Sequence, residues 1–166
     1  AHLHGGASDP RRTAPVDAQR GGGVTLADPR THDDALVAAL VAADLVVGDG
    51  GDPTDPFGWQ GAPGSSQFQP YVIAYPLTQT FDGGLGCSDS DSDLSWQVTC
   101  VGSTREQCDW VRHEVNTALI GQALTVSGRS VARVRADGGA GTRRDDTTQP
   151  PLFIATPRYA ALSVGA

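Results

Sequence analysis

Residues 94–121 read LSWQVTCVGSTREQCDWVRHEVNTALIG, and this stretch decides the expected fold. In its first part, apolar Leu94, Trp96, Val98 and Cys100 alternate with polar residues up to Val101. Alternation with a period of two is typical of a strand that has one buried and one polar face. The first part therefore predicts a strand in a sheet that is covered on one side.

The second part of the stretch predicts an amphipathic helix. Ser103 and Glu106 have the spacing of a capping box, and Gly121 marks the end of the helix. Between them, one helical face carries a continuous apolar stripe. The stripe consists of Cys108, Val111, Val115, Ala118 and Leu119.

Two further elements are expected upstream. Residues 71–77 alternate as a strand, with Tyr71 and Ile73 on one face and Val72 on the other. Residues 31–44 predict a helix that begins at Thr31 in a T-x-x-D pattern and repeats apolar residues at helical spacing. Residues 45–47 predict a short strand or a helix end, and the Gly- and Pro-rich residues 48–69 predict a long loop.

Downstream, residues 124–126 and 131–136 predict a hairpin around Ser127-Gly128-Arg129, with Ala132 and Val134 facing inward. A glycine-rich loop is expected over 138–149. Residues 152–164 predict the last strand, with Pro157 at a sheet edge or a bulge.

Together these elements predict an α+β fold. We expect a largely antiparallel sheet of about four to five strands, two main helices packed on one face, and long loops. Residues 1–30 lack apolar periodicity and predict a flexible N-terminal arm, followed by a single domain over 31–166.

Composition excludes several classes of protein. The chain has 166 residues, with 12 basic and 19 acidic side chains and a net charge of -7, which disfavours a duplex-binding protein. The longest apolar run, 35–43, is about half of the roughly 20 residues that a membrane-spanning helix needs. Three cysteines without C-x-x-C spacing specify neither a zinc site nor a disulfide framework, and no signal peptide is recognised. We therefore expect reduced thiols and synthesis in the cytosol.

Asp89, Asp91 and Asp93 resemble the opening of a calcium loop, in which alternate carboxylates converge on a cation. The pattern then fails, because Leu94 and Cys100 stand where an EF-hand requires Gly and Glu. A solvated acidic turn is the favoured interpretation. A small calcium- or metal-binding domain that also uses Asp82 stays as an alternative.

No constellation of residues indicates catalysis or a cofactor. His113 lies off the apolar stripe and is expected at the surface, and Cys108 is expected in the core. Nucleophile, zinc-protease, P-loop and dinucleotide motifs are absent from the sequence. A thiol-dependent enzyme that uses Cys87 stays as an alternative without an identified base.

Charges of both signs indicate contact surfaces. Acidic residues are concentrated in the first half of the chain, whereas the second half places opposite charges close together. Such a surface suits contact with a copy of itself, with ordinary solvated charge as the alternative. The candidate interface residues are Arg133, Arg135, Arg143, Arg144, Asp145 and Asp146. In the long loop, Phe57 and Trp59 either fold back on the core or anchor a partner.

Several segments then resemble one family of virion proteins. They are residues 69–76 (QPYVIAYP), 96–102 (WQVTCVG), 104–107 (TREQ), 143–146 (RRDD), 150–153 (PPLF) and 156–159 (TPRY). Over about 70–160 the chain resembles the tail terminator proteins of long-tailed, siphovirus-type actinobacteriophages. The long N-terminal arm departs from the compact start that this family implies.

The resemblance implies a structural protein without catalytic activity or cofactor. It implies a homo-hexameric ring at the head-proximal end of the tail tube that ends tube growth and meets a head-completion or neck protein. It also implies assembly in the host cytoplasm, no contact with a membrane, and DNA only as transiting cargo. Asp89, Asp91 and Asp93 are then candidates for an acidic lumen wall, because a cationic wall would bind the passing phosphates. Arg143 and Arg144 would meet carboxylates of a neighbouring subunit, and the loop 138–149 would become ordered between subunits. A head-to-tail connector or neck protein is the nearest alternative.

Overall fold

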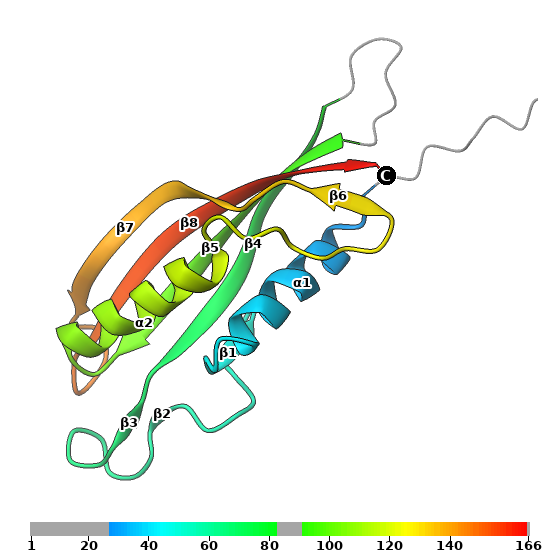
Figure 1. The fold of residues 1–166 in the computed structure, drawn as a ribbon. Helices are drawn as coiled ribbons and strands as arrows, with labels where there is room; N and C mark the ends of the chain where they lie inside the picture. The colour runs from blue at the N-terminus through cyan, green and yellow to red at the C-terminus, as the bar shows by residue number, and fades with distance from the viewer. Residues whose placement is uncertain (1–26, 83–90, 166) are drawn as a thin grey trace, which may run out of the picture.

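The computed structural model describes residues 27–82 and 91–165, which form a sheet with two helices packed on one face (Figure 1). Ten elements make up this part of the chain. They are α1 (Pro29–Val41), β1 (Val47–Asp49), β2 (Gly58–Trp59), β3 (Phe68–Gln69), β4 (Tyr71–Asp82), β5 (Asp91–Gly102), α2 (Arg105–Leu119), β6 (Arg129–Val131), β7 (Arg135–Asp145) and β8 (Leu152–Gly165). The predicted α+β class is confirmed.

The main sheet has six strands in the order β1-β4-β5-β8-β6, and β7 also pairs with β8. β1 runs parallel to β4, and every other pair in this sheet is antiparallel. β4 and β5 pair along almost their whole length, with Val72 opposite Cys100 and a bulge between Pro76 and Thr78. The predicted sheet of four to five strands is therefore the centre of a wider one, in which β1 forms one edge and β6 and β7 share the other.

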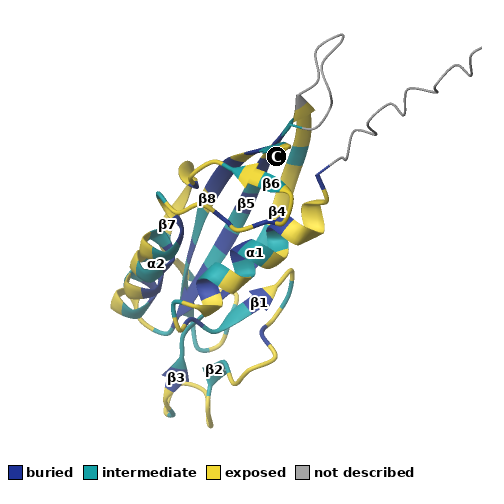
Figure 2. Cartoon of the chain, turned by 45° about the vertical axis from the view of Figure 1, so that its right-hand side comes forward, coloured by how far each residue is buried: buried dark blue, intermediate teal, exposed yellow. Residues whose placement is uncertain are grey.

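The core lies between the helices and one face of the sheet. Figure 2 shows the buried residues concentrated on β5 and β8, while the outer faces of both helices are exposed. The largest fully buried side chains on the sheet are Trp96 and Tyr159, and they belong to one buried cluster with Leu36 of α1 and Val115 of α2. Full burial of such a side chain stabilises the fold by about 1.5–3 kcal/mol.

α2 confirms the predicted helix and its apolar stripe, but its start differs by one residue. The N-cap is Thr104, whose hydroxyl accepts a hydrogen bond from the Gln107 amide at 3.2 Å. The Gln107 side chain in turn accepts one from the amide of Ser103 at 2.9 Å. The predicted capping pair of Ser103 and Glu106 is therefore wrong, and Thr104 and Gln107 take this role.

α1 begins earlier than expected. Asp28 is its N-cap and accepts a hydrogen bond from the Arg30 amide at 2.9 Å, and Pro29 occupies the first turn. Proline is favoured there because the first amides of a helix have no partner within the helix. Thr31 is thus inside the helix, and residues 27–30, expected in the arm, belong to the folded part. The rest of the predicted arm lies outside the described residues.

The glycine-rich segment expected as a loop over 138–149 is largely a strand. β7 pairs with β8 from Arg135, opposite Ala160, to Asp145, opposite Leu152, with two register shifts. Gly138 and Gly139 have φ of 80° and 105° and lie at the first shift. Glycine adopts these angles without strain, so β7 can bulge at this point.

The predicted hairpin at 124–136 is also wrong. β6 pairs with the end of β8, with Val131 opposite Ser163. This pairing with a strand distant in sequence takes the place of the expected local hairpin. The second expected arm instead pairs briefly with the residues before the first, through a bridge between Ala123 and Arg133 and hydrogen bonds that join Val134 to Gly121 and Gln122. Val134 is buried as predicted, but Ala132 is exposed.

Pro157 lies in β8, a strand with partners on both sides, opposite Gly139 at the bulge of β7. The expectation of an edge or a bulge is confirmed by the bulge. Within the predicted long loop 48–69, β2 and β3 form a small antiparallel pair.

Candidate interaction surface

β7 carries most of the predicted interface residues, and it is an outermost strand of the main sheet. One of its edges pairs with β8, and no strand in the described ranges pairs with the other. An unpaired edge exposes backbone donors and acceptors that can bind another chain. β7 therefore offers both charged side chains and free backbone groups.

At the end of β7, opposite charges pair within one chain. Arg144 forms an ion pair with Asp146 at 2.7 Å. Asp145 accepts hydrogen bonds from the Thr147 amide at 3.0 Å and from the Thr147 hydroxyl at 2.6 Å. These two bonds lower the pKa of the Asp145 carboxyl, because they stabilise its charged form. These contacts order the end of β7 and the turn after it within one chain, and the expected contact of this segment with a neighbouring subunit stays a prediction.

Other arginines near this edge have no ion pair in the part that the structure describes. Arg135 and Arg143 are exposed on β7. Arg133, just before β7, donates to the carbonyl oxygen of Gly121 at 2.7 Å and is also exposed. These side chains are available to the carboxylates of a partner.

The acidic candidates are only partly brought together. Asp89 lies outside the described residues. Asp91 and Asp93 share the face of β5 that points away from the helices, and Asp93 is exposed. Among the described residues no group of three or more His, Cys, Asp or Glu side chains could hold a metal ion.

Phe57 and Trp59 pack against their own chain. The Phe57 ring lies 4.9 Å from that of Tyr71, edge to face, and the Trp59 ring lies 5.1 Å from that of Phe68. Edge-to-face packing of this kind adds about 0.5–1.5 kcal/mol to the stability gained from burial. Both side chains remain partly exposed, so their role in partner docking stays a prediction.

At the opposite edge of the sheet, acidic residues surround β1 and the end of α1. Asp44, Asp52 and Asp55 are exposed and have no ion pair in the described part of the chain. Arg30 is the one arginine between residues 27 and 69, and it pairs with Asp34 at 3.0 Å and Asp49 at 2.6 Å. The sequence shows that the first half of the chain is acidic. It does not show that these residues lie along one edge of the sheet, because the strand order depends on tertiary pairing.

A buried polar network was also missed by sequence reasoning. His32 is fully buried, and its ring nitrogens lie 2.7 Å from the carbonyl oxygen of Asp28 and 2.8 Å from the hydroxyl of Ser163. Arg129 donates to the same hydroxyl at 3.0 Å. The network joins α1, β6 and β8. The sequence offered one indication of this burial, because His32 lies at helical spacing from Leu36 and Leu40 on the buried face of α1.

The remaining titratable candidates among the described residues are buried thiols or surface groups. Cys100 and Cys108 are buried free thiols, and burial raises the pKa of both. A thiol with a raised pKa is a poor nucleophile at neutral pH. Cys87 lies outside the described residues, and His113 is exposed on α2 as predicted. Of the helices described, none has the length and apolar character needed to cross a membrane.

Comparison with known proteins shows the fold. The chain is similar to one in the solved structure of the virion of a native gene transfer agent (GTA) particle, with a TM-score of 0.57 and 12% identity over 80% of this chain and 94% of that one. A second solved chain has a TM-score of 0.48 and 13% identity over 82% of this chain and 92% of its own. No protein-family model and no curated protein matches the sequence.

Proposed function

We propose that this chain is a structural protein of a phage-type virion, without catalytic activity, and more narrowly a tail terminator. It assembles as a homo-hexameric ring on the last ring of the tail tube, ends tube growth and presents its other side to a head-completion or neck protein. The protein would thus be located at the head-proximal end of the tail.

The observation that carries this proposal is the similarity of fold to a chain of the GTA virion, which spans 94% of that chain. The family resemblance of residues 70–160 points to the same class independently. The fold similarity covers 80% of this chain, and the resemblance covers more than half of it.

The net charge of the chain supports the narrower role. Asp91 and Asp93 lie on the face of β5 that no helix covers, and the whole chain has a net charge of -7. An acidic surface does not bind passing phosphates, so it suits the wall of a channel for DNA. Arg158 lies on the same face of the neighbouring strand β8, opposite Gln97, and Arg135 and Arg143 of β7 also share this face, so it carries both signs of charge.

The experiment that tests this function is co-purification in a phage that carries the tagged chain. Tails made in the absence of heads should retain a terminator, whereas a head-to-tail connector or neck protein should stay with heads made in the absence of tails. Recovery with heads alone would replace the terminator with a connector. Absence from both structures and from complete virions would contradict a virion role altogether.

A further inference from the structure

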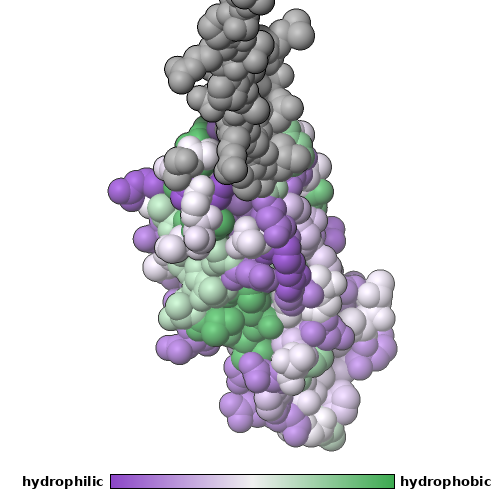
Figure 3. Space-filling model, turned by 90° about the vertical axis from the view of Figure 1, so that its right-hand side faces the viewer, coloured by the Kyte–Doolittle hydropathy of each residue, from purple (hydrophilic) through white to green (hydrophobic). Residues whose placement is uncertain are grey.

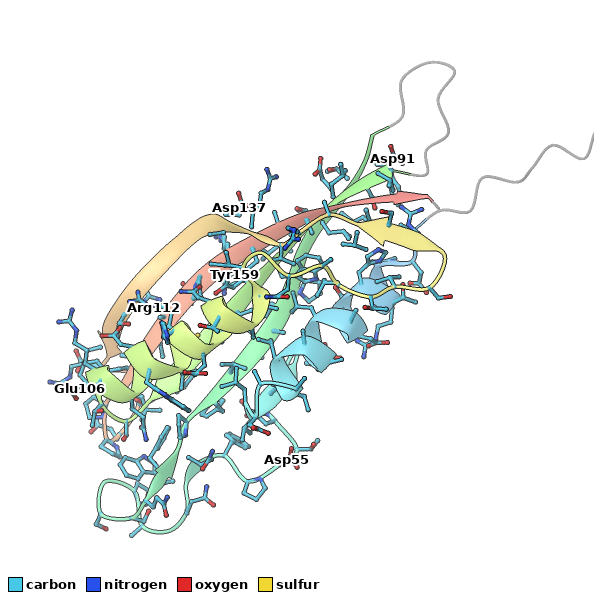
Figure 4. All side chains as sticks on the ribbon, in the orientation of Figure 1. Asp55, Asp91, Glu106, Arg112, Asp137 and Tyr159 are labelled. Atoms are coloured by element: carbon cyan, nitrogen blue, oxygen red, sulfur yellow. The ribbon has the colours of Figure 1, made fainter. Side chains whose placement is uncertain are left out.

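The two edges of the main sheet carry opposite charge. β1 and the segments beside it form what we call the acidic edge, defined by Asp44, Asp52 and Asp55. β7 forms the basic edge, defined by Arg133, Arg135 and Arg143. Figure 4 shows the separation: Asp137 marks β7 on one side of the molecule, and Asp55 lies on the other side below α1.

The basic edge keeps a positive surplus of one charge, because four arginines (Arg133, Arg135, Arg143 and Arg144) stand against three carboxylates (Asp137, Asp145 and Asp146). Asp146 pairs with Arg144 at 2.7 Å, whereas Asp145, which accepts hydrogen bonds from Thr147, keeps its negative charge near Arg143. Arg135 and Arg143 lie on the same face of β7, because they pair with Ala160 and Ile154 of β8, and both are exposed.

The acidic edge keeps a negative surplus in the same way. Arg30 is engaged by Asp34 and Asp49, and the Asp49 hydrogen bond is the main cause of the raised pKa of this guanidinium. No other arginine lies between residues 27 and 69 to neutralise Asp52 or Asp55.

An apolar area accompanies the acidic edge. Figure 3 views the side of the molecule that carries α1 and shows an apolar patch with polar residues around it. On the outer side of α1, Val41 is 54% exposed and Ala38 and Ala42 are also exposed. An apolar centre with a polar rim is the usual composition of a protein interface.

We propose that copies of this chain associate head to tail, with the basic edge of one copy against the acidic edge of the next. A ring needs a heterologous contact, in which two different surfaces of the same chain are complementary. The two edges lie at opposite ends of the strand order and differ in sign, so every copy presents one surface of each kind. Opposite charge sets the order of the surfaces and rejects contacts between like edges. This inference rests on the proposed ring and names the surfaces that close it.

The test uses two full-length variants that reverse one edge each. R135D/R143D makes both edges acidic, and D52R/D55R replaces two of the three carboxylates that define the acidic edge by cations. None of these four side chains forms an ion pair in the described residues, so both variants should keep the wild-type circular dichroism and thermal melting. D93R reverses a carboxylate in the middle of the sheet and serves as the control.

Self-association is measured by sedimentation velocity and native mass spectrometry. Each edge variant alone should associate at least about tenfold more weakly than the wild type, because like charges then meet. An equimolar mixture of the two variants should recover the wild-type assembly, with the two chains alternating. D93R should assemble as the wild type does.

Each other result overturns a different statement. If both folded edge variants assemble alone as well as the wild type, or if their mixture fails to recover, these edges are not the contact, and the ring itself stands. If the wild type stays monomeric in solution and on tail tubes, the proposed ring fails, and the contact fails with it.

Discussion

Substitution of Gly139 by alanine should weaken the fold strongly, because the bulge of β7 leaves no room for a side chain there. A Cβ at this position would lie 2.3 Å from the carbonyl oxygen of Thr156 and 2.7 Å from the Cα of Pro157. Both atoms belong to the backbone of β8, so neither can turn away. The φ of 105° adds strain for any residue other than glycine.

The matched control is Gly138→Ala. Its φ of 80° imposes similar strain, but no atom lies within 4 Å of the position that its Cβ would take. Backbone strain of this kind costs about 1–3 kcal/mol, and forcing atoms into a filled space costs about 1–3 kcal/mol more. We therefore expect Gly138→Ala to lower the free energy of unfolding by about 1–2 kcal/mol and Gly139→Ala by about 3–5 kcal/mol.

Equilibrium unfolding in urea, followed by tryptophan fluorescence, measures both variants under the same conditions. The smaller conformational entropy of the unfolded alanine chain offsets about 0.4–1 kcal/mol in each variant and so cancels in the comparison. Equal stability of the two variants, or a larger loss for Gly138→Ala, would refute the pairing of β7 with β8 at this bulge.

Two side chains that join the helices to the sheet allow further predictions. Tyr159→Phe removes the hydroxyl that donates to Asn116 at 2.7 Å and should lower the free energy of unfolding by about 1 kcal/mol, measured in urea; an unchanged value would contradict this bond. Burial raises the pKa of the Asp33 carboxyl, because the charged form is poorly solvated in the folded state. The charged carboxylate therefore lowers the free energy of unfolding, and this loss develops as the pH rises through the raised pKa. Asp33→Asn keeps an acceptor for the Trp96 indole, which donates at 2.7 Å. At pH 7 the variant should melt at or above the wild-type temperature, and its melting temperature should rise relative to the wild type as the pH increases from 3. A fall of its relative melting temperature over that range would contradict a raised pKa of Asp33.

The sequence allowed prediction of those elements that bury a side-chain pattern. β5 and α2 have clear periods of two and of three to four residues, because their inner faces form the core between helix and sheet. β7 could not be found in this way, because GGAG supplies no pattern and the strand depends on backbone pairing with β8. The start of α1 was visible in Asp28-Pro29, but Thr31 offered a competing cap.

For the candidate surface, the sequence indicated which charges matter but not how they are arranged. Arg143 and Arg144 are adjacent in sequence, yet Arg144 forms an ion pair with Asp146 and Arg143 has no ion pair in the described part of the chain. Alternation along β7 sends their side chains to opposite faces of the sheet. That Asp52 and Arg135 lie near opposite edges follows from the strand order, which depends on contacts between segments far apart in the chain.

The most direct test of the account is the native mass of the purified chain, with and without tail tubes, combined with electron microscopy of the product. We predict a sixfold ring, formed alone or as a cap on one end of a tube, with subunit contacts of at least roughly 1,200 Å². Reversal of Arg143 and Arg144 together should prevent it. A monomer that does not bind tubes would contradict the terminator account.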